Sequence, residues 1–333
     1  MIYINKTSAK KVRLVRLTKK TIKQKEAKLP RRSMLRDSEQ MSLLSMCLIP
    51  ALFVFVFSYL PMYGLILAFK NFNYADGILG SPWAGLANFE FLVNSVTFWR
   101  MIRNTLGMNF LMIGIGTMVN VAVALMLFEI HSRKKIKTYQ TLMLLPYFIS
   151  WVIVSYIVYA LLNPSFGVVN SILKSLGIEG IAWYDEPKYW PFILVFVSIW
   201  KGVGMGCVIY YASLMGLDPS LFEAAAIDGA TKFQRVRHIT IPSLIPIIVI
   251  QLILSVGHIM RADFGLFYQI PRDSGLLYPV TDVLDTYIYR VLKEQNNMSL
   301  SAATSFLQSF VSAALVLATN YVVKKIEPDN ALF

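Results

Sequence analysis

Residues 218–242 read DPSLFEAAAIDGATKFQRVRHITIP and separate two long apolar segments. Asp218 is a typical helix N-cap, and the proline after it suits the first helical position. Gly229 can adopt a positive φ and reverse the chain, because it has no side chain. Thr231 and Gln234 have the spacing of a capping box that opens a second short helix. The stretch therefore predicts two short helices joined by a tight turn.

The composition places the chain in the membrane class. Of its 333 residues, 56% are hydrophobic and only 15% are charged, which is too apolar for a soluble domain. Continuous apolar runs, without the alternation of barrel strands, predict helices. We therefore expect an all-α integral membrane protein with six transmembrane helices. The segments long enough to cross about 30 Å of hydrocarbon are 41–69, 104–128, 141–162, 190–215, 241–260 and 300–322.

Lysine and arginine are distributed unequally between the two sides of these spans. Residues 1–40, 129–140, 216–240 and the C-terminal tail hold 22 of the 32 Lys and Arg residues, whereas the alternate loops hold 9. Acidic residues divide almost evenly, 9 against 10. Because loops rich in Lys and Arg stay in the cytoplasm, we predict that both termini and the quoted stretch are cytoplasmic.

This pattern divides the chain into three parts. Residues 1–40 form a basic cytoplasmic tail, residues 41–323 the transmembrane domain with its cytoplasmic loop 218–242, and residues 324–333 a second cytoplasmic tail. We expect the first tail to be solvated; the alternative is a basic helix on anionic lipid headgroups. Since the net charge of +13 is not spread over a soluble face, we expect contact with a lipid bilayer and none with nucleic acid.

The quoted stretch closely resembles the EAA motif of ABC-transporter permeases, which reads EAA-x3-G-x9-I-x-L-P. Ile241 is the one departure, because the family pattern has leucine there. The resemblance implies the type I importer permease fold and a coupling helix that docks on a cytoplasmic ATPase; the alternative is an ordinary alanine-rich loop. The residues that it assigns to ATPase coupling are Glu223, Ala224, Ala225, Asp228, Gly229, Ile239 and Pro242.

Three further blocks, Trp200–Gly204, Asp263–Gln269 and Thr281–Tyr287, look like carbohydrate-type permeases. They most resemble the LplB-like branch, which takes oligosaccharides and polysaccharide fragments, and the likeness covers residues 41–333. It implies import by alternating access in a bacterial cell membrane. The implied partners are a second homologous permease, an ABC ATPase dimer and an extracytoplasmic solute-binding protein. ATP and Mg²⁺ would bind the ATPase, and no cofactor would bind this chain.

Polar residues inside the apolar spans indicate a substrate path. Lys201 lies near the middle of the fourth span, where a charge is costly and marks a functional position. Three glycines after it, Gly202, Gly204 and Gly206, permit close helix packing. Ser255, His258 and Arg261 are three residues apart on the fifth span, which places them on one face, and Asp263 follows. The substrate-path candidates are Lys201, Gly202, Met205, Ser255, His258, Arg261 and Asp263.

Part of this set is carried over from the sugar permeases that the chain resembles. Their substrate contacts correspond by offset from the motif to Lys201, Gly202, Met205, Ser255, Ile259 and Ala262. Ile259 and Ala262 depart from the family, because some relatives have amides there. The alternative role for the charged candidates is a structural ion-pair network between spans.

The leading hypothesis is a permease subunit of an ATP-driven importer for an oligosaccharide or polysaccharide fragment. Lys201 and Arg261 slightly favour an acidic fragment, because a carboxylate gains charge-assisted hydrogen bonds. The alternatives are a permease for peptides or amino acids, an ion-coupled carrier or channel, and a membrane-embedded enzyme. The sequence has no Walker A or HExxH motif, and its three histidines are scattered, so we predict no catalytic or metal site.

Overall fold

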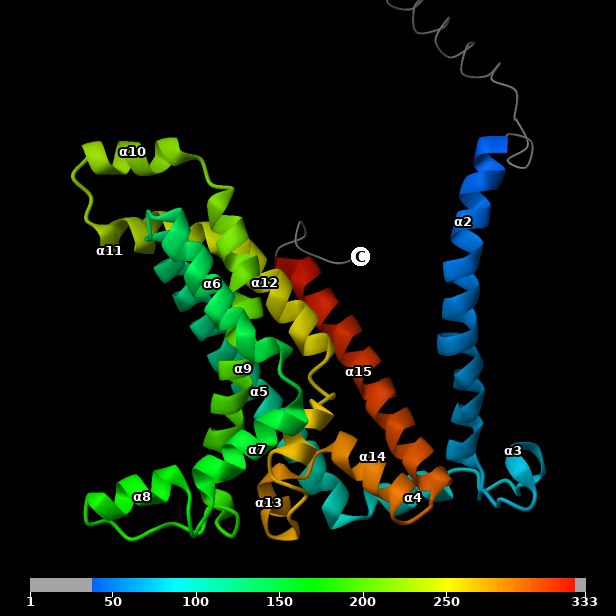
Figure 1. Ribbon diagram of the computed structural model, residues 1–333. Helices are drawn as coiled ribbons and strands as arrows, with labels where there is room; N and C mark the ends of the chain where they lie inside the picture. Colours follow the sequence, from blue (N-terminus) through cyan, green and yellow to red (C-terminus); the bar gives the residue numbers. More distant parts are fainter. Residues whose placement is uncertain (1–37, 327–333) are drawn as a thin grey trace, which may run out of the picture. The chain divides into compact units, whose positions relative to one another are not determined.

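The structure, a computed structural model, describes residues 38–326, and nearly all of its regular structure is helical (Figure 1). The first 37 residues of the predicted basic tail, and residues 327–333 of the second tail, lie outside the described part. Within residues 38–326 the only β-type pairing is an isolated bridge between Lys70 and Trp83. The all-α prediction is confirmed for this part of the chain.

Two compact units divide the chain between Tyr63 and Gly64. The first contains α2 (Ser38–Val54), the π-helix η1 (Phe55–Tyr59) and the start of the 3₁₀-helix η2 (Leu60–Phe69).

All later helices belong to the second unit. The short helices α10 and α11 lie at one end of this unit, and α8, α13 and α14 lie at the other (Figure 1). In chain order the elements are α3 (Gly77–Gly80), α4 (Ala87–Val93), α5 (Val96–Phe128), α6 (Arg133–Phe148), α7 (Trp151–Leu162), α8 (Val168–Ser175), η3 (Pro187–Tyr189), α9 (Trp190–Met215), α10 (Pro219–Ile227), α11 (Lys232–Arg235), η4 (Val236–Thr240), α12 (Ile241–Gly257), η5 (Gly265–Gln269), η6 (Gly275–Leu277), α13 (Tyr278–Thr281), α14 (Leu284–Lys293) and α15 (Met298–Ile326).

Five helical stretches are long and apolar enough to cross a membrane, and a bent pair makes a sixth if it counts as one span. The bent pair is α6 and α7, whose axes differ in direction by 96°. The predicted segment 141–162 is therefore not one straight helix. Ile149 and Ser150 have extended backbone conformations that separate its two parts. The five stretches are Ser42–Phe69, Val96–Phe128, Pro187–Met215, Lys232–Gly257 and Met298–Lys325.

Two predicted boundaries also change. The second apolar helix begins at Val96 rather than at residue 104. The second helix of the loop is not a separate short element, since helical structure continues from Lys232 through α11, η4 and α12 to Gly257. Pro242 lies inside this continuous helix, directly after the wider π-turn η4. A π-turn is a common local adjustment in a helix, and proline lacks the amide N–H that a regular turn needs.

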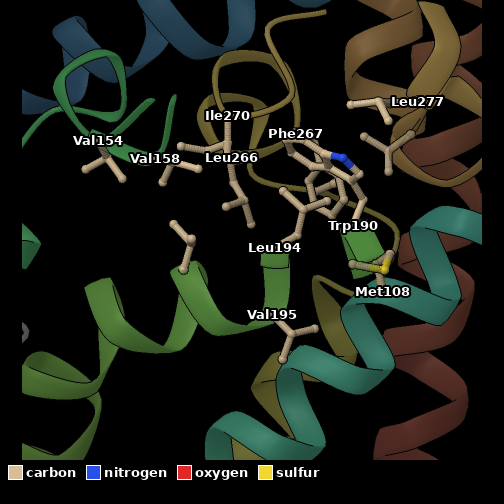
Figure 2. Packing of buried hydrophobic residues seen from close by; sticks show 13 residues of the cluster. Met108, Val154, Val158, Trp190, Leu194, Val195, Leu266, Phe267, Ile270 and Leu277 are labelled. Carbon is tan, nitrogen blue, oxygen red and sulfur yellow. The ribbon is translucent and has the colours of Figure 1, made fainter. Parts of the chain in front are cut away.

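The largest buried cluster joins α9 to the segment around η5. Figure 2 shows Trp190 and Leu194 of α9 close to Leu266, Phe267 and Ile270. Each fully buried side chain of this kind contributes about 1.5–3 kcal/mol from apolar burial. The indole N–H of Trp190 is also satisfied, because it donates to the carbonyl of Trp183 at 2.6 Å. The cluster fixes the end of α9 that is far from α10.

Two smaller clusters complete the packing of the second unit. One joins α4, α5, α14 and α15 through residues such as Leu92, Met101 and Leu284. The other joins α5, α9 and α12 through Leu214 and Leu244, near the loop that carries α10. Buried contacts therefore hold α9 at both of its ends.

Two of the three glycines in α9 allow close helix contacts. A Cβ on Gly204 would overlap the carbonyl oxygen of Met143 in α6, and one on Gly206 would overlap the side chain of Asn120 in α5. A Cβ on Gly202 would meet nothing within 4 Å. The prediction of glycine-mediated packing is confirmed for Gly204 and Gly206 and is wrong for Gly202.

Gly204→Ala should destabilise the helix packing by about 1–3 kcal/mol, because the added methyl group forces α6 away from α9. Gly202→Ala is the matched control, and it should be neutral or slightly stabilising, since alanine favours a helix over glycine by up to about 1 kcal/mol. Thermal unfolding of the two purified variants measures the difference. Equal midpoints for both variants would contradict the assignment.

Candidate functional site

The bracket, residues 218–242, has the local structure that its sequence predicts. A carboxylate oxygen of Asp218 accepts from the backbone N–H of Ser220 at 2.9 Å, and this bond holds the pKa of Asp218 below its usual range. Gly229 has φ of 75° and reverses the chain. Gln234 accepts from the backbone N–H of Thr231 at 2.7 Å, and Thr231 Oγ1 accepts from the backbone N–H of Gln234 at 3.3 Å. The helix–turn–helix prediction is confirmed, with its second helix extended as described above.

The predicted coupling residues occupy both arms of the bracket. In order, Glu223, Ala224 and Ala225 lie in α10, Asp228 caps its C-terminus, Gly229 makes the turn, Ile239 lies in η4 and Pro242 lies in the first turn of α12. Three large apolar side chains of the bracket, Leu221, Ile227 and Phe233, are exposed, and Ile227 is 87% accessible. Exposed apolar side chains beside small alanines provide a surface that a partner protein can cover.

Two contacts connect the bracket to the end of α5. The ring of Phe222 packs against that of Phe128, with centroids 5.5 Å apart. The ammonium of Lys232 forms an ion pair with Glu129 at 3.5 Å. Both arms are thus in contact with α5, while α10 follows α9 and α11 continues into α12. A displacement of the bracket would act directly on these three long helices.

Lys201 holds the broken end of α6. Its Nζ donates to three backbone carbonyls, those of Pro146 at 3.2 Å, Tyr147 at 2.7 Å and Ile149 at 2.7 Å. An ammonium group has three N–H donors, so the three carbonyls take up its full capacity. The Nζ atom also lies 5.1 Å from the ring centroid of Trp151. Lys201 therefore satisfies the backbone at the break between α6 and α7.

Trp151, the first residue of α7, connects this break to the chain beyond α12. Its indole N–H donates to the carboxylate of Asp263 at 3.0 Å. Its ring lies so close to Gly265 that a Cβ there would overlap it. Asp263 also accepts from the backbone N–H of Leu266 at 3.2 Å and so orders the first turn of η5. Contact with Trp151 therefore explains both the aspartate and the glycine of the Asp263–Gly265 pattern.

The predicted shared face of Ser255, His258 and Arg261 is wrong. Helix α12 ends at Gly257, and His258 caps it with a non-helical conformation. His258 and Arg261 are both exposed and lie past the helix. The spacing rule fails because it assumes a helix that continues for another turn.

Ser255 instead lines a polar cavity of ≈ 260 Å³ between α5, α9 and α12. Its hydroxyl donates to the carbonyl of Gln251 at 2.7 Å. Polar side chains are costly inside apolar spans, so their presence in the sequence was a signal that our site prediction missed. The other polar side chains of this cavity are Thr117, Asn120, Tyr210 and Gln251.

The remaining path candidates do not form one cluster. Among the ion pairs of residues 38–326, none joins Lys201, His258, Arg261 and Asp263 to one another. Trp151 contacts both Lys201 and Asp263, which form no salt bridge with each other. Gly202 is partly accessible, and Met205 is exposed. The set therefore divides between the α6–α7 break, the cavity that Ser255 lines, and the exposed turn after α12.

Two carboxylates, those of Asp282 before α14 and Asp285 within it, connect elements at the end of the second unit that carries α13 and α14. Asp282 is buried and is paired with Arg290, which also binds Asp273 at 2.9 Å. Asp285 accepts from the backbone N–H of Ala262 at 2.8 Å and from the side chain of Gln308 at 3.0 Å. Burial raises the pKa of Asp285, although both hydrogen bonds oppose the shift. Asp285 therefore fastens α15 and the turn after α12 to α14.

Long apolar helices joined by an exposed helix–turn–helix bracket are typical of a membrane-embedded transport permease. Residues 138–330 match the family model described as a binding-protein-dependent transport system inner membrane component. The chain belongs to this family, and it is a multi-pass translocation subunit rather than an enzyme.

Individual relatives agree with this assignment. The chain is 33% identical over 288 residues to protein LplB of Bacillus subtilis (strain 168), which covers 86% of this chain and 90% of that protein. It is 32% identical over 300 residues to the polygalacturonan/rhamnogalacturonan transport system permease protein YteP of the same organism. This match covers 90% of this chain and 93% of that protein.

Solved structures of a bacterial alginate transporter are also similar. A chain of an ABC transporter involved in the import of the acidic polysaccharide alginate matches with a TM-score of 0.79 and 32% identity, covering 87% of this chain and 97% of that chain. A chain of a bacterial alginate ABC transporter in complex with an alginate pentasaccharide-bound periplasmic protein matches with a TM-score of 0.80, covering 89% and 98%. The resemblance to carbohydrate-type permeases is confirmed.

Lys201→Met should destabilise the protein by about 1.5–3 kcal/mol, because it removes the charged donor that three carbonyls at the break share. Lys134→Met, at an exposed position of α6, is the matched control and should have little effect. Thermal unfolding and the yield of assembled transporter measure the loss. A Lys201→Met variant with wild-type stability that fails only in uptake would contradict the structural role and restore Lys201 as a substrate contact.

Proposed function

We propose that this chain is one of two permease subunits of an ATP-driven importer for an oligosaccharide or polysaccharide fragment. The observation that carries the proposal is the bracket itself, with its positive-φ Gly229 and exposed apolar side chains between α9 and α12. Its likeness to protein LplB and YteP supports a carbohydrate rather than a peptide or an amino acid.

The bracket would couple ATP hydrolysis to alternating access. A partner ATPase dimer that closes on ATP and Mg²⁺ would move α10, and this chain itself would bind neither. Because α9 leads into α10 and the helix from α11 leads into α12, the movement would reach both helices. These two helices also line the cavity of Ser255. Their displacement would change access to it from either side.

The relatives favour an acidic fragment as the substrate. One structural neighbour is described as importing an acidic polysaccharide, alginate, and one relative is named for polygalacturonan and rhamnogalacturonan. The charge of Lys201 no longer supports this preference, because three carbonyls already accept from its ammonium. We infer that another cation, outside the break between α6 and α7, binds the acidic group.

The distribution of charge supports the orientation of the chain, and the family supports its remaining partners. We infer six spans, with α6 and α7 counted as one, and both termini in the cytoplasm of a bacterial cell. A second homologous permease would pair with this chain in the membrane. An extracytoplasmic solute-binding protein would deliver the sugar at the end that carries α8, α13 and α14, opposite the bracket.

Gly229→Val should uncouple ATP hydrolysis from uptake, because a β-branched residue strains a backbone with φ of 75° and misplaces α10. Gly229→Asn is the matched control, since asparagine tolerates this conformation, and it should retain coupling. Glu223→Lys should weaken ATPase docking. The assay is oligosaccharide uptake and sugar-stimulated ATP hydrolysis in proteoliposomes that contain the complete transporter. Wild-type coupling in both Gly229→Val and Glu223→Lys would refute the coupling role.

Cysteine labelling tests the orientation, after replacement of Cys47 and Cys207. Labels at Ser38 and Asn330 should react only from the cytoplasm, and labels at Asp185 and Ser274 only from outside. A membrane-impermeant maleimide, applied to intact cells and to inverted vesicles, makes the distinction. Labelling of Ser38 and Asp185 from the same side would refute the six-span arrangement.

A further inference from the structure

A small polar hollow of ≈ 190 Å³ lies between α7 and the end of η5 with the turn that follows it. It is separate from the cavity of Ser255 and from the bracket. With the orientation proposed above, it lies toward the outer side of the membrane. The residues that line it are Val152, Ser155, Tyr156, Tyr268, Gln269, Arg272 and Asp273.

The turn that presents Arg272 has an unusual backbone. Arg272 has φ of 57° and Asp273 has φ of 48°, a left-handed region that costs such residues on the order of 1 kcal/mol or more each. Asp273 is held in place by its carboxylate, which accepts from Arg290 at 2.9 Å and from the hydroxyl of Tyr278 at 3.1 Å. The surrounding structure therefore imposes this conformation, and with it the position of the Arg272 side chain at the hollow.

The hollow contains a cation without an acidic partner. The guanidinium of Arg272 lies over the ring of Tyr159, 4.2 Å from its centroid. Among the ion pairs of the described chain, none includes Arg272. The one carboxylate of the hollow, that of Asp273, is already paired with Arg290. Lys201 donates to three carbonyls, whereas Arg272 is exposed and forms no ion pair within the described chain.

The remaining lining residues have the chemistry of a sugar site. Tyr156 is 63% exposed and Tyr268 is half-buried, so both offer an apolar ring beside a hydroxyl group. Gln269 adds a planar amide with two donors and an acceptor. A guanidinium binds a carboxylate through two parallel hydrogen bonds. The combination fits a sugar ring that carries one carboxylate better than it fits a neutral sugar.

We propose that this hollow is an outer contact site for a uronic-acid residue of the transported oligosaccharide. Arg272 binds the carboxylate, and Tyr156 packs against the face of the sugar ring. The inference rests on the proposed import function, and it assigns the preference for an acidic fragment to a residue that is not among the substrate-path candidates. It also explains why the strained turn after η5 is held so firmly.

The experiment measures the complete transporter, with its own second permease, ATPase and solute-binding protein, in proteoliposomes. The probes are alginate and galacturonate trimers, each as the free acid and as the methyl ester. Arg272→Gln should lower the ratio of acid to ester uptake about ten-fold or more, because it removes a charge-assisted contact. Arg272→Lys should lie between Arg272→Gln and wild type, since it keeps the charge without the planar fork. Tyr156→Ala should reduce uptake of acid and ester alike, because ring stacking does not depend on the charge.

Arg133→Gln is the matched control, because Arg133 is exposed in the first turn of α6, and its uptake ratio should equal that of wild type. Equal losses of acid and ester in Arg272→Gln would overturn the inference and would indicate that the hollow docks a protein. A wild-type transporter that imports only neutral oligosaccharides would also overturn it, while leaving sugar import intact. A wild-type transporter that imports no oligosaccharide with ATP would overturn the proposed function itself.

Discussion

Backbone groups at membrane depth must find partners within the protein, because hydrocarbon offers none. In this chain, helical hydrogen bonding is interrupted between two apolar helices where α6 stops and α7 leaves at 96°. Three carbonyls of the break accept from the one ammonium of Lys201, which belongs to α9. An unsatisfied carbonyl in such a place costs several kcal/mol. The bent path of the chain is therefore tied to the position of α9.

Side chains at the break between α6 and α7 also contact the segments that follow α12. Trp151 lies beside Lys201, contacts Gly265 and donates to Asp263. Ala262, which precedes Asp263 in the chain, donates its backbone N–H to the carboxylate of Asp285 in α14. A movement of α9 or α12 that begins at the bracket thus meets a connected set of polar contacts near α7. Because α9 and α12 carry the two arms of the bracket, this set of contacts connects the end with α10 to the end with α14.

Local features of the site could be predicted from sequence, whereas features made by distant segments could not. The N-cap at Asp218, the turn at Gly229 and the capping box depend on residues a few positions apart, and all three are present. The break at residues 149–150 was missed because the apolar pattern continues across it. The partners of Lys201 were missed because backbone carbonyls have no identity in the sequence. The positive φ of Arg272 was also hidden, since arginine rarely adopts it.

The placement of charge along the path has a physical consequence for transport. The cavity between α5, α9 and α12 is lined by amides, hydroxyls and apolar groups and by no charged side chain. Such groups can exchange hydrogen bonds with successive sugar hydroxyls, but they cannot bind a carboxylate strongly. A fixed cation in the middle of the path would hold an acidic substrate where it has to move. In the proposed function, selection by charge therefore falls to an exposed cation outside the spans, because the ammonium of Lys201 already donates to three backbone carbonyls.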